Sequence, residues 1–172
     1  MSSDCIFCQI VAGDAPSAPI AETESTFAFM DIQPGSDGHL LVVPKRHSTD
    51  LRDIPAEDLS AVALESQRIA KHAFDAWGAD GVNLLNCCGA EAWQTVFHFH
   101  MHVIPRYRDK DKDRLHLPFD PGVRGNPELI GTLAASMRES LGEERGIAVI
   151  AADPPADLPG QVDDRHPRRG RG

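Results

Sequence analysis

Polar and apolar residues alternate strictly in the segment QTVFHFHMHVIPRY, residues 94–107. The odd positions from Phe97 to Val103 are apolar, and the even positions between them hold His98, His100 and His102. Successive side chains of a β-strand point to opposite faces, so this period of two predicts a strand. One face of that strand would be apolar and the other would carry three imidazoles, whereas a helix would spread the rings around its circumference.

Three more segments have the composition of strands. Residues 26–32 (TFAFMDI) and 39–44 (HLLVVP) are largely apolar, and the turn-forming residues QPGSDG between them indicate a hairpin. Residues 82–86 (VNLLN) form the third segment. Because the predicted strands do not alternate with helices in βαβ order, we expect an α+β protein with an antiparallel sheet.

Three segments show helical periodicity. The N-terminal CIFCQIVAGD is amphipathic and ends at Gly13, and residues 55–77 repeat apolar side chains at helical spacing up to Gly78. A third helix begins at Asn126, a good cap, with Pro127 at its first position. Its expected buried stripe consists of Leu129, Ile130, Leu133, Met137 and Leu141.

The composition of the chain changes near its end. Residues 146–150 (GIAVI) have the pattern of a late strand, whereas residues 151–172 are rich in Pro, Gly and charge. Such a segment buries too little apolar surface to offset the entropy of ordering it, so we expect a disordered tail. The predicted organisation is one domain over residues 1–150, with a C-terminal helical extension, followed by the tail at 151–172.

The net charge of −9 narrows the class of partner. The tail holds four Asp and four Arg, so the negative excess lies in residues 1–150. Such a body repels a polyanion, so long nucleic acid is not an expected partner, although a local site can still bind a small anion. The sequence shows neither an apolar run of membrane-spanning length nor a signal-peptide pattern, and we therefore expect a cytoplasmic protein without membrane contact.

Three aligned imidazoles admit three interpretations. They could face water, although strand propensity does not favour three histidines in register. They could bind a metal, but positions i and i+4 of an extended strand lie about 13 Å apart, so His98 and His102 cannot both reach one ion. The third interpretation is nucleophilic catalysis, in which one imidazole attacks phosphorus while its neighbours fix its tautomer and handle the leaving group.

Three sequence blocks favour the catalytic interpretation. FMDIQP, GHLLVVPKRH and QTVFHFHMHVIPRY follow one another, and HFHMHV fits the pattern HxHxHxx with x apolar. Between Cys5 and about Arg108 the chain thereby resembles the histidine triad (HIT) family of nucleotide hydrolases and transferases, and within it the bacterial Hint-like members. The resemblance implies a five-stranded antiparallel HIT-like sheet with one long, one short and one C-terminal helix, and a homodimer.

The activity that the resemblance implies is transfer of a nucleotidyl group from a small nucleotide substrate. His100 would attack the α-phosphorus of a nucleoside 5′-phosphoramidate or dinucleoside polyphosphate, and water would then hydrolyse the covalent nucleotidyl-imidazole. His102 would contact the leaving group, and His98 would support the site. The residues implied to bind the nucleotide are Ile6, Phe7, Ile10, Phe29 and Ile32 around the base, Asp31 at the ribose, and Asn86, Gln94 and Thr95 near the phosphates. Without the resemblance, the apolar set could equally be core and Asp31 a turn residue.

Cys5 and Cys8 admit two interpretations, as packing residues or as metal ligands. Their C-x-x-C spacing suits one half of a tetrahedral site. In some bacterial relatives with this N-terminal pattern, two Cys and two His bind structural zinc. The resemblance therefore implies a zinc site formed by Cys5, Cys8, His47 and His98, while the chemical step itself needs no cofactor.

The chain departs from the family pattern in the loop near the phosphates. Trp93 stands where Gly is frequent, and Cys87 and Cys88 follow Asn86 where polar amides are frequent. We expect these cysteines to be small buried residues, and we expect His39 to have a structural role. Two rival classes remain, a non-catalytic nucleotide-binding protein and a zinc-dependent hydrolase, and the sequence does not identify the leaving group.

Overall fold

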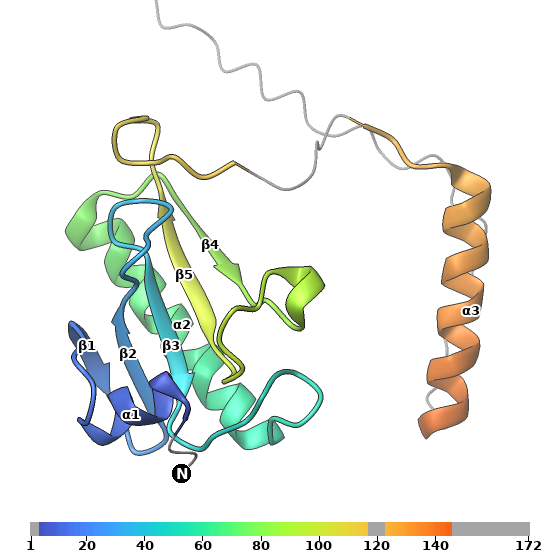
Figure 1. Ribbon diagram of the computed structural model, residues 1–172. Coiled ribbons are helices and arrows are strands. Elements are labelled where there is room, and N and C mark those ends of the chain that lie inside the picture. Colours follow the sequence, from blue (N-terminus) through green and yellow to red (C-terminus); the bar gives the residue numbers. More distant parts are fainter. Residues whose placement is uncertain (1–3, 117–122, 146–172) are drawn as a thin grey trace, which may run out of the picture. The chain divides into compact units, whose positions relative to one another are not determined.

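The chain forms a five-stranded antiparallel sheet flanked by helices (Figure 1). The computed structural model describes residues 4–116 and 123–145, except the side chains of 143–145. The chain consists of two compact units, residues 1–117 and 118–172. The sheet has the strand order β1-β2-β3-β5-β4. Its strands are β1 Pro19–Glu22, β2 Thr26–Met30, β3 Leu40–Pro44, β4 Gly81–Leu85 and β5 Met101–Arg106.

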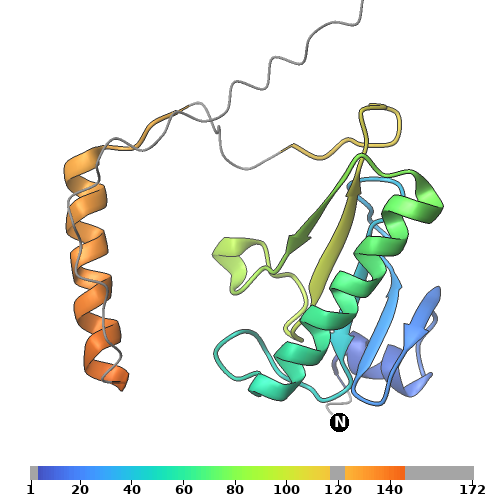
Figure 2. The same cartoon turned by 180° about the vertical axis from the view of Figure 1, so that it is seen from behind.

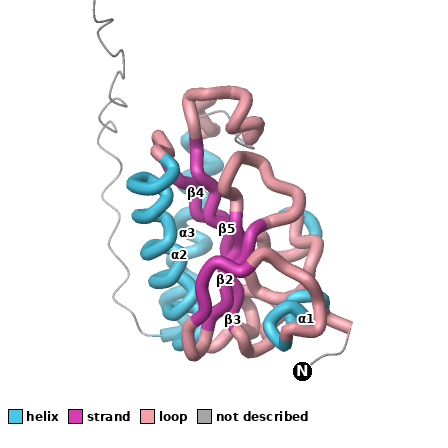
Figure 3. The backbone as a smooth tube through the Cα atoms, turned by 90° about the vertical axis from the view of Figure 1, so that its left-hand side faces the viewer, coloured by secondary structure: helices cyan, strands magenta, loops and turns pink. Residues whose placement is uncertain are grey.

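Two helices of the first unit lie on opposite faces of this sheet. The long helix α2, Ala56–Trp77, packs on one face, and the short helix α1, Ile6–Ala12, packs on the other (Figures 2 and 3). Each helix ends, as predicted, at a glycine in the left-handed conformation, with φ of 81° at Gly13 and 64° at Gly78. A short 3-10 helix, η1 Ala90–Ala92, lies in the connection between β4 and β5.

The central strand β3 explains why the sequence HLLVVP is apolar without alternation. Leu40 and Val42 belong to the core cluster beneath α2, whereas Leu41 and Val43 belong to the cluster beneath α1. A strand that is covered on both faces carries apolar side chains at every position. Because β3 pairs with β5, it places the histidine segment at the middle of the sheet.

The predicted fold class is confirmed, with two differences among the strands. β1 was not predicted, because it has only four residues, which are largely exposed and show no clear alternation of apolar and polar side chains. β5 begins at Met101 rather than at the start of the alternation, because its pairing with β3 ends at Val42 and Met101, although β3 continues to Pro44 beside β2. Beyond that point the backbone N–H of Phe99 donates to the carbonyl of Ser48 (2.6 Å) instead of to a neighbouring strand.

The described element of the second unit is helix α3, Pro127–Arg145. Its predicted cap is confirmed, since Oδ1 of Asn126 accepts hydrogen bonds from the backbone N–H groups of Glu128 (2.9 Å) and Leu129 (3.3 Å). The predicted burial of its apolar stripe is wrong. All five side chains of that stripe are exposed: Leu129, Ile130, Leu133, Met137 and Leu141. Periodicity determines which residues share a helix face, but not whether another element covers that face.

The remaining C-terminal predictions lie outside the described residues. They comprise the late strand at 146–150, the tail at 151–172 and the domain boundary at residue 150. Among the helices of residues 4–116 and 123–145, none is long and apolar enough to cross a membrane.

Ile69→Ala should destabilise the first unit by about 2–5 kcal/mol, because it removes buried methyl groups and leaves a cavity beneath α2. Ile69 packs there with Leu40 and Val103. The matched control on the same helix is Leu64→Ala. Leu64 is 67% exposed, so this change should stay within about 0.5 kcal/mol. Urea denaturation measures both free energies of unfolding, and equal losses in the two variants would contradict this packing.

Candidate active site and metal centre

The three histidines lie where β5 begins, on the face of the sheet that α1 covers. Phe99 and Val103 belong to the core cluster beneath α2, so the alternate residues face the other way. His98 and His100 precede the strand and are buried, and His102 is a residue of β5. The predicted alternation of faces is therefore present, although only its last part belongs to the sheet ladder.

His100 is held as a neutral imidazole with a defined tautomer. Its Nδ1 lies 2.7 Å from the carbonyl oxygen of His98. A carbonyl can only accept, so Nδ1 carries the proton and donates. Burial lowers the pKa of His100, which keeps the ring neutral at pH 7. The lone pair is then on Nε2, and a neutral imidazole lone pair is the form that attacks an electrophile.

His102 has the opposite tautomer, which neighbouring groups also determine. The backbone N–H of Gly35 donates to Nδ1 of His39 (3.1 Å), so His39 carries its proton on Nε2. This Nε2–H donates to Nδ1 of His102 at 2.9 Å, which leaves the proton of His102 on its own Nε2. The ring centroids of His100 and His102 are 4.9 Å apart. A ring with a nucleophilic lone pair therefore lies against a ring with a donor N–H.

Burial also keeps His102 neutral. Burial, followed by the neighbouring His100 and His39, lowers the pKa of His102 to about 4, although the carboxylate of Asp31 opposes this. Oδ2 of Asp31 lies 3.6 Å from Nε2 of His39, and Oδ1 accepts the backbone N–H of Gln33 at 2.8 Å. Asp31 is thus a turn residue, as its sequence context allowed, and at the same time a carboxylate beside the histidines.

Asp31, His39 and His102 also bring three potential metal-ligand atoms within 4.8 Å of one another. However, Nε2 of His39 carries the proton that His102 accepts, because Gly35 donates to the other nitrogen of His39. A protonated nitrogen has no lone pair for a metal. His39 and His102 are therefore joined by a hydrogen bond beside the carboxylate of Asp31, and the three residues do not form a metal site.

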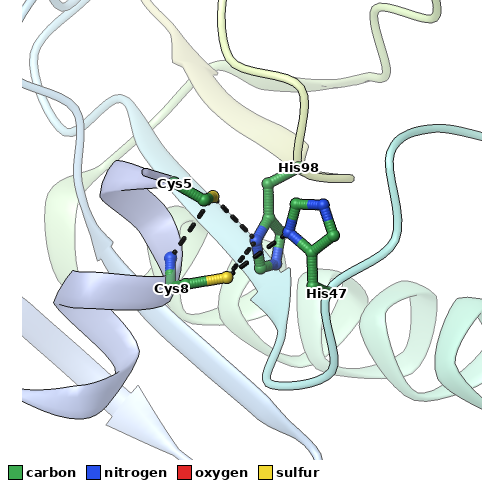
Figure 4. A group of neighbouring side chains, drawn as sticks. All are labelled: Cys5, Cys8, His47 and His98. Atoms are coloured by element: carbon green, nitrogen blue, oxygen red, sulfur yellow. Dashed lines mark hydrogen bonds between the residues drawn. The ribbon is translucent and has the colours of Figure 1, made fainter. Parts of the chain in front are cut away.

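A separate cluster gathers the four residues that the sequence assigned to a metal. Cys5 and Cys8 from the start of α1, His47 from the loop after β3, and His98 converge in Figure 4. Their ligand atoms, two Sγ and two Nδ1, all lie within 4.8 Å of one another. Nε2–H of His98 donates to the carbonyl of Pro44 at 2.9 Å, which directs the Nδ1 lone pair toward the sulfur atoms.

The spacing of these four atoms fits a tetrahedral ion. With Zn–S bonds of about 2.3 Å and Zn–N bonds of about 2.0–2.1 Å, sulfur and nitrogen on one zinc lie about 3.5 Å apart. Nδ1 of His98 lies 3.4 Å from Sγ of Cys5 and 3.5 Å from Sγ of Cys8, and Nδ1 of His47 lies 3.3 Å from Sγ of Cys8. Burial lowers the pKa of His98 to about 4, so its ring is neutral, as a metal ligand must be.

The residues expected around a nucleotide base divide into two groups. Phe7, Ile10 and Phe29 are buried together beneath α1, where the rings of Phe7 and Phe29 meet edge to face at 5.4 Å. Ile6 and Ile32 are exposed, with 43% and 92% of their surface accessible. The buried group forms core as well as a potential pocket floor, and the exposed pair is accessible to a ligand.

The residues expected near the phosphates are held in different ways. Nδ2 of Asn86 donates to the carbonyl of His100 at 2.9 Å and so supports the backbone at His100. Gln94 is buried, and its amide donates to the carbonyl of Thr49 at 2.7 Å, which holds its loop in place. The side chain of Thr95 is exposed. Of the three residues, Thr95 is the one that a phosphate could reach. Asn86 and Gln94 instead hold the main chain at His100 and Thr49.

Sequence reasoning missed the contact of His39 with His102. The two residues meet because β3 pairs with β5, and that register cannot be read from either segment alone.

The departure from the family pattern at Trp93 corresponds to an unusual backbone conformation in the structure. Trp93 has a φ of 66°, the one positive value among the non-glycine residues that the structure describes, and glycine is the residue that adopts this conformation without strain. Cys87 is buried, as expected, and burial raises the pKa of its thiol, whereas Cys88 is only partly buried.

Known proteins resemble this chain over most of its length. The family model described as HIT domain matches residues 12–109. A HIT-like protein of Mycobacterium tuberculosis is 38% identical over 144 residues, which cover 84% of this chain and 97% of that protein. The crystal structure of a zinc-bound histidine triad family protein from Mycobacterium smegmatis is 40% identical, with a TM-score of 0.63, and the match covers 83% of this chain and 99% of that chain. The adenosine 5′-monophosphoramidase HNT1 of Saccharomyces cerevisiae is 40% identical over 110 residues, or 64% of this chain and 67% of that protein. With its triad, its fold and these relatives, the chain belongs to the histidine triad (HIT) family.

Proposed function

We propose that this protein hydrolyses nucleoside 5′-phosphoramidates or dinucleoside polyphosphates, or transfers their nucleotidyl group, through a covalent nucleotidyl-histidine. The observation that carries the proposal is the tautomer of His100. Its Nδ1–H is bound to the carbonyl of His98, and its Nε2 therefore has the lone pair that can attack phosphorus. The activity of the yeast relative supports the choice of phosphoramidates as one of the two substrate classes.

In the first step, Nε2 of His100 forms a bond to the α-phosphorus, and the bond from phosphorus to the leaving group breaks. Nδ1–H stays on the ring and donates to the carbonyl of His98, which stabilises the positive charge of the nucleotidyl-imidazole. The Nε2–H of His102 donates to the bridging atom of the leaving group as negative charge develops there.

In the second step, water attacks phosphorus and the bonding electrons return to Nε2 of His100. The hydroxyl of that water remains on the nucleotide, and its proton balances the departed leaving group, so the sum of the two steps is hydrolysis. Another acceptor in place of water gives transfer.

Nucleotide binding requires a hydrogen-bond acceptor for the ribose and an apolar surface for the base. We assign the ribose to Asp31, whose carboxylate lies beside the histidines. We assign the base to Phe7, Ile10 and Phe29 with the exposed Ile6 and Ile32. Thr95, with its exposed hydroxyl, would contact the phosphate oxygens. As the family resemblance implies, the protein would act as a cytoplasmic homodimer.

We also propose that Cys5, Cys8, His47 and His98 bind one structural zinc. Four protein ligands complete a tetrahedral shell and leave no open position for a water or substrate, unlike a catalytic zinc. This arrangement argues against a zinc-dependent hydrolase. When bound, the ion would supply folding stability rather than a nucleophile.

His100→Ala should lower turnover by at least about a thousandfold, because the variant lacks the attacking atom. The affinity for a nucleoside monophosphate should change little, since Asp31 and the apolar residues remain. Turnover is measured with an adenosine phosphoramidate and a dinucleoside polyphosphate, and acid-labile nucleotide label is trapped on the wild type by rapid denaturation.

The control is His72→Ala, which changes an exposed histidine on α2 and should retain full turnover. Near-normal turnover of the His100 variant would refute the mechanism, whereas nucleotide binding without turnover by the wild type would identify a non-catalytic member.

One zinc per chain should be present in protein that is purified without chelator. Structural zinc contributes on the order of 10–16 kcal/mol in small peptides, so its removal should loosen α1. Metal analysis gives the stoichiometry, and hydrogen exchange of residues 5–13 reports the loosening. Protein that carries no zinc after such purification would leave Cys5 and Cys8 as packing residues.

The proposal requires a neutral His102 at pH 7, and this predicts a pH dependence of stability. The pKa of His102 falls from an ordinary value of 6.5 to about 4 in the folded chain. Between these values the unfolded chain binds a proton that the native chain does not, so stability falls as the pH drops from 6.5 toward 4, by up to about 1.4 kcal/mol per pH unit. Urea denaturation at pH 7, 6 and 5 should therefore give a shallower slope for His102→Gln than for the wild type. Equal slopes would show that His102 is not kept neutral by the fold.

A further inference from the structure

The side chain of His98 belongs to the cluster of proposed zinc ligands, with Cys5, Cys8 and His47, and its main chain belongs to the candidate active site. We propose that Cys5, Cys8 and His47 are positioning residues for the nucleophile, acting through the peptide group that joins His98 to Phe99. This inference rests on the proposed role of His100, and it assigns to the cluster a function beyond structural support.

The first connection runs through the imidazole of His98. Both of its nitrogens are engaged, with Nε2–H on the carbonyl of Pro44 (2.9 Å) and Nδ1 at 3.4–3.5 Å from the sulfur atoms of Cys5 and Cys8. Contacts at both edges prevent the buried ring from rotating. A fixed ring restricts the backbone conformation of His98. The carbonyl of His98 in turn accepts the Nδ1–H of His100 at 2.7 Å.

The second connection runs through the main chain beside His47. The next residue, Ser48, accepts the backbone N–H of Phe99 at 2.6 Å through its carbonyl. This N–H and the carbonyl of His98 belong to one planar peptide group. The loop that carries His47 therefore holds one end of the same peptide plane whose other end fixes the tautomer of His100.

The third connection is the ring of Phe7, a residue of α1 that stands in the sequence between the N-cap residue Cys5 and Cys8. It meets the ring of His100 edge to face, with centroids 5.3 Å apart and planes at 88°. A helix of seven residues is not stable by itself, so its anchoring to the cluster also determines where Phe7 lies. Three separate connections thus end at the nucleophile.

The consequence concerns the proton of His100. A neutral imidazole has two tautomers, and the carbonyl of His98 selects the one with the proton on Nδ1. When the peptide plane turns, this selection is lost and part of the population carries the proton on Nε2. A ring in that form has no lone pair at the attacking position, so turnover falls even when the substrate is saturating.

The test uses His47→Ala in the full-length chain, because His47 is the exposed member of the cluster. Long-range proton–nitrogen NMR spectra of the histidines report the tautomer of His100. We expect one tautomer, with the proton on Nδ1, in the wild type and a mixture in His47→Ala. Turnover at saturating substrate should fall by about 10–100-fold, as is typical when a supporting group is lost.

Two controls separate positioning from general destabilisation. His72→Ala removes an exposed histidine of α2 and should match the wild type in both measurements. His47→Cys supplies a different zinc ligand and should restore the single tautomer and most of the turnover.

A second arm needs no substitution. Wild-type protein stripped of metal by a chelator should give the same mixed tautomers as His47→Ala, and zinc alone should reverse the change in the stripped wild type but not in His47→Ala. If both preparations keep the Nδ1–H tautomer of His100, the inference is overturned. The spectra decide this even for a protein that turns over no substrate, so failure of the proposed function is recognised separately.

Discussion

One hydrogen bond, from Nδ1–H of His100 to the main-chain carbonyl of His98, is the contact on which the rest of the site depends. It is short, buried and unambiguous in direction, because a carbonyl has no proton to donate. It leaves the lone pair of His100 on the nitrogen beside the ring of His102. The chain from Gly35 through His39 directs the opposite tautomer at His102. Two chemically identical side chains thereby acquire opposite tautomers, His100 from a main-chain carbonyl and His102 from the imidazole of His39.

The fold is organised to keep that hydrogen bond in place. β3 is covered on both faces, by the clusters beneath α2 and α1, and it holds β5 in register. The pairing of β3 with β5 ends at Val42 and Met101, so the segment before β5 leaves the ladder, and the carbonyl of Pro44 fixes the ring of His98. The other ring nitrogen of His98 contacts the sulfur atoms of Cys5 and Cys8 at the start of α1. A strand end, a short helix and a loop therefore converge on one residue of the triad.

Much of this could be predicted from the sequence, and the physical reasons are specific. The alternation around His98, His100 and His102 gave the assignment of faces, and the left-handed glycines Gly13 and Gly78 marked where the helices end. β1 is short and largely exposed and so leaves no clear pattern, whereas the contact of His39 with His102 depends on pairing between distant segments. The stripe on α3 could be recognised but its burial could not, because periodicity does not reveal what covers a helix. Asn86 and Gln94 could be named as site residues, whereas their bonds to main chain follow only from the folded loop.

Attack by Nε2 of His100 is tested most directly on the covalent intermediate itself. Protein with ¹⁵N-labelled histidine is mixed with substrate and denatured rapidly, and the coupling between ³¹P and ¹⁵N identifies the nitrogen that carries the nucleotide. We expect a single phosphorus–nitrogen bond at Nε2 of His100, because Nδ1 is occupied by the proton that the carbonyl of His98 accepts. A bond at Nδ1 of His100, or at any other histidine, would contradict it.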